Sequence, residues 1–226
     1  KSPYNTMEIL SGVEHDLKNP LSIILFEMQE LQRISNSQQD GVEKAQTVIN
    51  QLEIINDYFD RIRLLQPFPT NEMRDVDFDA IVKNAVSSVK MQMRCSDVKF
   101  ELAIQENMPQ LFCYEYNLQQ AIQQVLVNAV EALDANGTVE IDLKYDRNDL
   151  ICTIVDFGVG FSKDLEEKIF DLFFTTKKES KADGVGLSIA HSIVYNHGGT
   201  IQLTCDEKNG TTAVIKIPRK NSGKKN

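Results

Sequence analysis

Apolar residues in the first 65 positions recur at alternating intervals of four and three residues. Two such runs are present, and residues 35–41, a segment of turn-forming side chains, separate them. The first run comprises Leu10, Leu17, Leu21, Ile24, Met28 and Leu31, with the polar Glu14 at the position between the first two, and the second comprises Ala45, Val48, Leu52, Ile55, Phe59, Ile62 and Leu65. Because this spacing is typical of the inward stripe of bundle helices, it predicts two long helices joined as a hairpin.

A single hairpin cannot bury both of these apolar stripes. Pairing with a second copy into a four-helix bundle is the economical solution, so we predict a homodimer. Residues 66–70, which include Pro67 and Pro69, end the second helix. We therefore expect a helical hairpin domain at residues 1–66 and a linker at residues 67–75.

After the linker, helical periodicity alternates with strand periodicity. The pattern predicts helices at 78–93, 116–133 and 184–196, and strands at 99–104, 138–145, 150–155, 200–205 and 212–217. Residues 146–149 and the pair Asn209-Gly210 supply hairpin turns. We therefore predict an α+β domain at residues 76–219, with an antiparallel-rich sheet covered by helices on one face, and a disordered basic tail at 220–226.

The composition suits one or two globular domains and argues against some partners. Apolar residues make up 42% of the 226 residues, and the formal net charge is −9. Because nucleic acids and anionic membranes attract positively charged faces, we expect no nucleic-acid partner and no direct membrane contact. The four cysteines have no metal-ligand spacing, which is typical of reduced thiols in a cytosolic protein. No apolar run approaches the roughly 20 residues that span a bilayer, and we expect a cytoplasmic fragment of a longer protein.

One polar cluster lies on the first predicted helix. His15 is one residue off the apolar stripe and should face outward, and Asp16 follows it directly. A neutral imidazole is a competent nucleophile near pH 7, and an adjacent carboxylate can orient the ring or take up its proton. The alternative for a lone histidine is an exposed side chain on a solvated helix face.

Two glycine motifs follow in the second half. Asp156, Gly158 and Gly160 come directly after a predicted strand, although a plain turn explains this motif equally well. Gly184 and Gly186 open a predicted helix, where backbone N–H groups and the helix dipole favour an anion. The Walker loop is absent, so a P-loop enzyme is excluded.

Two further features are ambiguous when each is taken alone. Phe170, Phe173 and Phe174 precede a run of Thr and Lys that includes Lys177, which suits either a mobile flap over a phosphate or a small hydrophobic cluster. Asn128 lies on an otherwise apolar helix, where its carboxamide needs partners. It is either a core residue tied to backbone or a ligand for a hydrated Mg²⁺ ion.

The order and spacing of these motifs together resemble the catalytic core of a two-component sensor histidine kinase. The matching segments are residues 15–21 (H box), 128–129 (N box), 156–160 (G1 box), 170–177 (F box), 183–187 (G2 box) and 210–212 (a weaker last motif), and His197-Gly198-Gly199 also fits the family. The resemblance implies a dimerisation and phosphotransfer hairpin followed by a Bergerat-type ATP-binding α/β sandwich.

The resemblance also assigns nucleotide-binding roles, with ATP and Mg²⁺ as cofactors. Asp156 would hold the adenine amino group, and Asn128 would bind Mg²⁺. The nucleotide site would be completed by Gly158, Gly160, Phe173, Phe174, Lys177, Gly184, Gly186, Leu187 and Thr212.

The transfer chemistry would lie on the hairpin. His15 would attack the γ-phosphorus with Asp16 as acid or base, and the group would pass to an Asp of a response regulator receiver domain on a separate protein. Asn19, one turn after His15, matches the family position that orients water for dephosphorylating the regulator. We therefore expect both kinase and phosphatase activity.

Several residues depart from the family pattern. Gln124 replaces an earlier Asn of the N box, and Glu131 replaces a frequent basic residue. Ala182 and Asp183 stand where the G2 box often has Gly and Thr, and Leu172 replaces a Pro of the F box.

Two other functions stay open at this point. A chaperone-like ATPase of the Bergerat fold would lack the H box on a preceding hairpin, and a dimeric scaffold with a weak nucleotide domain would not transfer phosphate. We expect a cytoplasmic location for this part of the protein. This expectation is compatible with a full-length protein that is anchored in the inner membrane.

Overall fold

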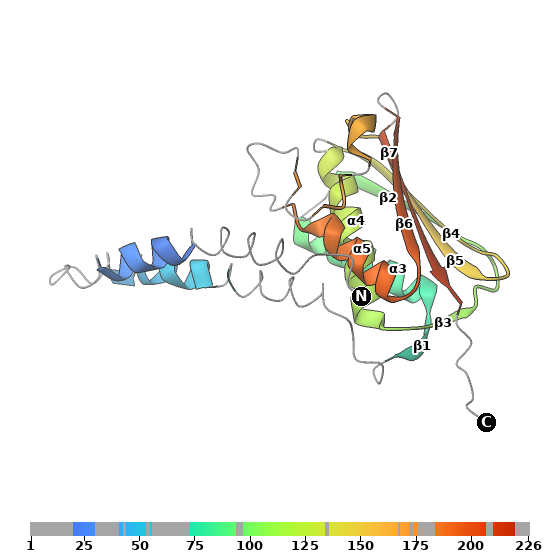
Figure 1. The fold of residues 1–226 in the computed structure, drawn as a ribbon, viewed down its shortest axis with the longest axis horizontal. Coiled ribbons are helices and arrows are strands. Elements are labelled where there is room, and N and C mark those ends of the chain that lie inside the picture. The colour runs from blue at the N-terminus through green and yellow to red at the C-terminus, as the bar shows by residue number, and fades with distance from the viewer. Residues whose placement is uncertain are drawn as a thin grey trace. The chain divides into compact units, whose positions relative to one another are not determined.

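The structure is a computed structural model that describes residues 20–29, 41–42, 44–52, 55, 73–93, 97–133, 136–166, 168–171, 174–175, 184–206 and 210–219. The chain divides into two compact units, Lys1–Gln66 and Pro67–Asn226 (Figure 1). Each unit is described by itself.

The described part of the first unit is helical. It comprises residues 20–29 and all described positions from 41 to 55. An ion pair joins the two segments, since Lys44 Nζ lies 3.0 Å from Glu27 Oε2. Of the predicted stripe, Ile55 is buried, whereas Leu21 and Leu52 are about half exposed in the single chain, at 52% and 48%.

The second unit contains a five-stranded sheet with the order β2-β4-β5-β7-β6 (Figure 1). The strands are β2 (Val98–Ile104), β4 (Gly137–Tyr145), β5 (Asp149–Asp156), β6 (Thr200–Asp206) and β7 (Gly210–Pro218). Only the β2–β4 pair among these is parallel, and the other three pairs are antiparallel. The prediction of an antiparallel-rich sheet is confirmed.

Three helices cover one face of this sheet: α3 (Phe78–Met93), α4 (Glu115–Ala132) and α5 (Gly186–Asn196) (Figure 1). Alternate residues of the strands point toward the helices, because side chains alternate between the two faces of a strand. The largest fully buried side chains of the resulting core include Ile122 and Leu126 of α4, Ile189 and Ile193 of α5, and Leu143, Leu150 and Ile154 of the sheet. This two-layer α/β sandwich confirms the predicted fold class.

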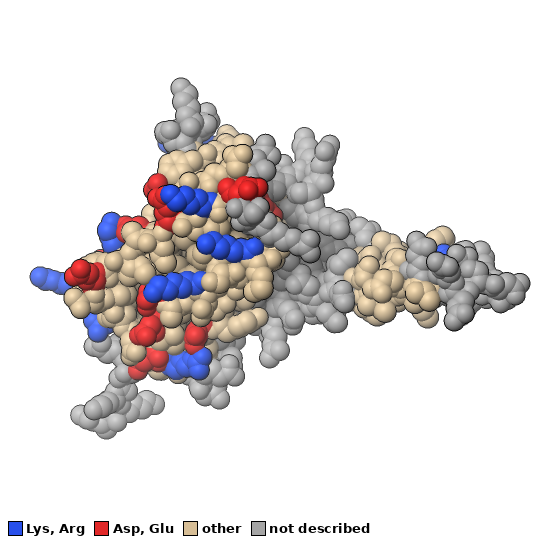
Figure 2. Space-filling model, turned by 180° about the vertical axis from the view of Figure 1, so that it is seen from behind, with Lys and Arg blue, Asp and Glu red and all other residues tan. Residues whose placement is uncertain are grey.

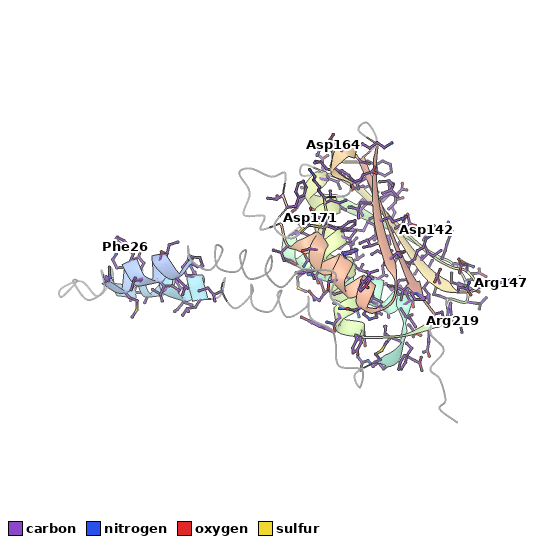
Figure 3. All side chains as sticks on the ribbon, in the orientation of Figure 1. Phe26, Asp142, Arg147, Asp164, Asp171 and Arg219 are labelled. Atoms are coloured by element: carbon purple, nitrogen blue, oxygen red, sulfur yellow. The ribbon has the colours of Figure 1, made fainter. Side chains whose placement is uncertain are left out.

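The other face of the sheet is open to solvent. It carries charged side chains such as Asp142, which is labelled in Figure 3 on the side away from the helices and pairs with Lys144. On the side of the molecule that Figure 2 shows, Lys and Arg are interspersed with Asp and Glu.

A second, two-stranded antiparallel sheet of β1 (Arg74–Asp77) and β3 (Gln110–Cys113) was not predicted. It corrects the expected linker, whose last two residues, Arg74 and Asp75, belong to β1. Both strands have four residues and β1 is mostly exposed, so neither produces a clear alternation of apolar and polar residues. The Arg74 guanidinium pairs with Glu115, the first residue of α4, and thereby ties β1 to that helix.

The cysteines of the described residues, Cys113, Cys152 and Cys205, are free thiols. Burial raises the pKa of Cys113 and of Cys152 to about 12, so both remain protonated at neutral pH.

Candidate functional site

Asp156 is a buried carboxylate at the end of β5. Its side chain is only 4% exposed, and its Oδ1 accepts two backbone hydrogen bonds, from Gly158 N at 3.0 Å and from Thr211 N at 3.2 Å. Burial raises the pKa of Asp156, and the hydrogen bonds from Gly158 and Thr211 oppose that rise. A buried acceptor held this rigidly is suited to a ligand that donates a hydrogen bond.

Two glycines near Asp156 allow close approach of backbone segments, Gly158 to the end of α4 and Gly210 to Asp156 itself. A Cβ on Gly158 would lie 2.2 Å from the carbonyl oxygen of Ala132, at the end of α4, and one on Gly210 would lie 2.1 Å from the carbonyl oxygen of Asp156. Gly210 also has φ +86°, a conformation that favours glycine. These distances leave no room for any side chain at either position.

The loop after Asp156 is held at both ends. Val159 N donates to Ala132 O at 3.1 Å, and Phe161 N donates to the Cys205 Sγ at 2.9 Å. Between them, Gly160 has φ +62°. The predicted motif at 156–160 is therefore a tightly fixed loop between the end of α4 and strand β6.

Asn128 and Gln124 lie one turn apart on α4, and each is half-buried. Within the part of the chain that the structure describes, neither carboxamide makes a hydrogen bond. Since no side-chain N or O atom among the described residues is both buried and without a partner, these two carboxamides still reach solvent and are open to a polar ligand.

The N-terminus of α5 belongs to the same region. Gly184 has φ +67°, and the helix begins at Gly186. Its N-cap residue is Val185, whose apolar side chain cannot accept hydrogen bonds from the first N–H groups of the helix. These N–H groups and the helix dipole favour an anion. Leu187 is half-buried in this first turn.

His197 connects the two helices that carry these groups. It is 3% exposed, its Nε2 accepts from Tyr114 N at 3.1 Å, and its Nδ1 lies 2.7 Å from Ile193 O. Tyr114 is the N-cap of α4, and Ile193 lies in the last turn of α5. The imidazole therefore fixes the start of α4 against the end of α5.

The structure places a neighbour of one predicted site residue against Asp156. Thr212 lies opposite Val155 in the β5–β7 register, whereas Thr211 lies opposite Asp156 and donates to it. Among the described residues, the residue of β7 that contacts Asp156 is therefore Thr211, and a nucleotide contact of Thr212 stays a prediction. Sequence reasoning missed Thr211 and Cys205 because only the strand register reveals which residue faces Asp156.

Part of the predicted F box is described. Phe170 stacks on His191 of α5, with ring centroids 5.2 Å apart, and Phe174 is half-buried. Burial lowers the pKa of His191, so its ring is neutral at pH 7.

Five predicted site residues lie outside the described residues: His15, Asp16, Asn19, Phe173 and Lys177. Of the described site residues, Asp156, Gly158 and Gly160 lie around one loop, which touches the end of the helix that carries Asn128. Among the described residues, no helix has both the length and the hydropathy needed to cross a membrane.

Comparison with known proteins agrees with this geometry. Residues 113–221 match the family described as histidine kinase-, DNA gyrase B- and HSP90-like ATPases. The sensor histidine kinase ZraS of Escherichia coli O157:H7 is 24% identical over 93% of the chain, and the heme sensor protein HssS of Staphylococcus saprophyticus is 26% identical over 93%. The chain spans less than half of each relative, 45% and 46% respectively.

A solved structure extends the likeness to the fold of nearly the whole chain. The histidine kinase ThkA, in complex with the response regulator protein TrrA, has a TM-score of 0.67 at 19% identity over 94% of this chain and 61% of that chain. The matched family covers residues 113–221, and the motifs, the fold and the relatives together make this chain similar to the catalytic core of two-component sensor histidine kinases.

Proposed function

We propose that the chain is an ATP-dependent protein histidine kinase that phosphorylates its own His15 and passes the phosphoryl group to an Asp of a response regulator. The observation that carries the nucleotide half of this proposal is the buried Asp156 carboxylate, held by the N–H groups of Gly158 and Thr211. The His15 half rests on the H-box resemblance.

The Asp156 site favours adenine over guanine. Adenine carries an exocyclic amino donor where guanine carries a carbonyl acceptor. A buried carboxylate accepts a hydrogen bond from the amino group of adenine. The carbonyl oxygen of guanine would instead be repelled, because both it and the carboxylate are acceptors. Gly158 lets the loop that donates to this carboxylate lie directly against Ala132 at the end of α4. The geometry therefore fits an adenine nucleotide.

The half-buried carboxamide of Asn128 fits a hydrated Mg²⁺ ion. Mg²⁺ prefers oxygen ligands and keeps several waters, with few ligands from the protein. When bound, Mg²⁺ neutralises charge on the β- and γ-phosphates during transfer. Asn128 would hold the ion through its side-chain oxygen, and the first turn of α5 would favour the negatively charged phosphates.

The transfer itself needs positioning more than covalent chemistry from the protein. His15 would act as the nucleophile, and Asp16 would orient its ring or take its proton. Lys177 would contact phosphate, and Phe173 and Phe174 would cover the nucleotide.

A response regulator receiver domain is the proposed partner. The ThkA structure contains such a regulator by its title. We propose that Asn19, one turn after His15, orients a water that dephosphorylates the regulator. An Asn19→Ala variant should then keep autophosphorylation and lose regulator dephosphorylation, measured as the decay of phosphorylated regulator.

The remaining proposals concern organisation. The hairpin at residues 1–66 would form a homodimer, the linker would cover 67–73, and the catalytic domain would begin at β1 and extend to residue 219, followed by a tail. A kinase that uses ATP and a response regulator would place this part of the protein in the cytoplasm.

Incubation with γ-labelled ATP and Mg²⁺ tests the proposal, with native protein compared with His15→Gln. Phosphohistidine is labile in acid and stable in alkali, so the expected result is acid-labile label on the native chain and none on the variant. Label-free protein that turns over ATP would instead identify a chaperone-like ATPase. Label-free protein without turnover would identify a scaffold.

A further inference from the structure

The loop after Asp156 has few buried side chains. Phe157 is 53% exposed and Val159 is 76% exposed, so neither of these apolar side chains anchors the loop in the core. Gly158 and Gly160 have no side chain to bury. A segment with few buried apolar contacts opens easily unless polar contacts hold it. The position of this loop therefore depends on its hydrogen bonds.

One hydrogen bond lies at the start of the loop and another at its end. At the start, Gly158 N donates to Oδ1 of Asp156 at 3.0 Å. At the end, the backbone N–H of Phe161 donates to Sγ of Cys205 at 2.9 Å, across 44 residues of sequence. Between them, Gly160 has φ +62°, so the chain turns sharply before it reaches Cys205. Cys205 thus fixes the end of the loop whose start holds the carboxylate.

Strand pairing places Cys205 in the same row of the sheet as Asp156. Cys205 of β6 lies opposite Thr211 of β7, and Thr211 lies opposite Asp156 of β5. Residues directly opposite each other on paired strands have their side chains on the same face of the sheet. Because neighbouring strands are about 4.8 Å apart, Cys205 lies roughly 10 Å from Asp156, which is too far for direct contact. The thiol therefore acts on the carboxylate through the loop.

We propose that Cys205 is a positioning residue of the nucleotide site. Its Sγ fixes the end of the loop at residues 157–161, the loop holds Gly158 N against Asp156, and the carboxylate thereby keeps the orientation that an adenine amino group needs. This inference rests on the proposed nucleotide function. It predicts that Cys205 controls affinity for the base and leaves the contacts to phosphate unchanged.

The chemistry of a thiol suits this position. Cys205 follows Ile201 and Leu203 on the core face of β6, where an apolar side chain is favoured, and it is half-buried. A thiol packs as a small apolar group and still accepts a weak hydrogen bond. Cys113 and Cys152, in contrast, are completely buried, as expected for thiols that fill the core. Because sulfur is a weak acceptor, the loss of this contact should change ligand affinity only a few-fold.

Two substitutions in the whole chain separate the acceptor from the volume of the side chain. Cys205→Val keeps an apolar side chain that suits a strand and removes the acceptor, whereas Cys205→Ser keeps an acceptor. Binding of Mg²⁺·ADP is measured by calorimetry for native protein and both variants. Cys205→Val should weaken binding about fivefold, equivalent to the loss of one ordinary hydrogen bond, and Cys205→Ser should retain most of the affinity.

A second ligand separates positioning of the carboxylate from general damage to the site. The 5′-diphosphate of purine riboside keeps the ring system, the sugar and the phosphates of ADP and lacks the amino group that Asp156 would accept from. Its affinity should be the same for native protein and Cys205→Val, because the carboxylate makes no hydrogen bond to it. An equal loss with both ligands would show a purely structural role for Cys205, and unchanged ADP binding in Cys205→Val would show no role; either result overturns the inference.

Hydrogen exchange and a matched control separate this inference from the function on which it rests. In nucleotide-free Cys205→Val, the amides of Phe161 and Gly158 should exchange faster than in native protein, and unchanged rates would overturn the inference whatever the protein binds. Thr204→Val makes the same kind of change one residue earlier, at an exposed position on the opposite face of β6, and should leave the affinities and exchange rates unchanged. If native protein does not bind Mg²⁺·ADP, the proposed function fails.

Discussion

Nε2 of His197 accepts a hydrogen bond from the backbone N–H of Tyr114 at 3.1 Å, across 83 residues of sequence. This contact joins the start of α4 to the end of α5, and each helix carries part of the proposed nucleotide site. Because the other ring nitrogen faces the carbonyl of Ile193 at 2.7 Å, the ring is held as the neutral tautomer with its proton on Nδ1.

Replacing His197 should destabilise the catalytic domain. His197→Leu leaves the N–H of Tyr114 buried without an acceptor, which costs about 1–3 kcal/mol. For a domain of this size, that corresponds to a decrease of roughly 2–12 °C in the unfolding midpoint, measured by circular dichroism. His197→Gln provides the control, because its side-chain oxygen can replace Nε2 as acceptor and should recover part of the loss. Equal losses in the two variants would contradict this role for the hydrogen bond.

Asp156→Asn should raise the stability of the protein at pH 7 and at the same time abolish nucleotide binding. The buried carboxylate has a raised pKa, so the folded state holds its proton more tightly than the unfolded state does. Between the ordinary carboxyl pKa of 3.8 and the raised value, stability therefore falls as pH rises, and it stays lower above that window. The amide cannot ionise and keeps an oxygen for the N–H groups of Gly158 and Thr211.

The expected result is a variant that is more stable than native protein at pH 7 and equally stable at pH 3. Chemical denaturation at the two pH values measures this difference. The same substitution should abolish adenine-nucleotide binding. With its oxygen toward Gly158 and Thr211, the amide turns its NH2 group toward the adenine amino group, and two donors cannot form a hydrogen bond. A loss of stability at pH 7 that exceeds the loss at pH 3 would contradict the sign of this effect.

Gly158→Ala should disrupt the loop after Asp156. The new Cβ would meet the carbonyl oxygen of Ala132, which is backbone and cannot rotate away. Overpacking of this kind costs about 1–3 kcal/mol and should also break the hydrogen bond from Val159 N to Ala132 O. The measurements are the unfolding midpoint and ADP affinity, which should both fall. A crystal structure of the variant with an unmoved loop would contradict the argument.

Leu52→Glu should dissociate the proposed dimer. Leu52 belongs to the predicted apolar stripe and is 48% exposed in the single chain, so pairing with a second copy would bury it. Light scattering after size-exclusion chromatography should show a dimer for native protein and a monomer for the variant. Asn50→Glu adds the same charge at an exposed position off the stripe and should stay dimeric. A monomeric native chain would refute the dimer.

Much of the catalytic fold could be predicted from periodicity. The helix predicted at 78–93 matches α3 at both ends, because Phe78, Ile81, Val82, Ala85 and Val89 form a regular buried stripe. The strands of the large sheet were equally clear, since each alternates between a core face and a solvent face. Strands β1 and β3 were missed because four residues are too few for a pattern and their partner is distant in sequence.

The site was predictable in its motifs but not in its contacts. Asp156 and its glycines stand out in the sequence, whereas Thr211 reaches Asp156 only through the pairing of β5 with β7. Gln124 looked like a departure from a family pattern. Its contact with Gly186, where an added Cβ would lie 2.8 Å from its Oε1, depends on how α4 packs on α5, which no local spacing reveals.

The most direct test of the proposed kinase activity asks whether phosphorylation of the chain depends on Asp156. Native protein, Asp156→Asn and Asp142→Asn are incubated with γ-labelled ATP and Mg²⁺, and acid-labile label on the chain is quantified. Asp142 lies on the open face of the sheet and pairs with Lys144, so its variant controls for the loss of a carboxylate. The proposed kinase predicts label on native protein and Asp142→Asn, and none on a folded Asp156→Asn. Equal labelling of all three would show that the phosphoryl group does not pass through the Asp156 site.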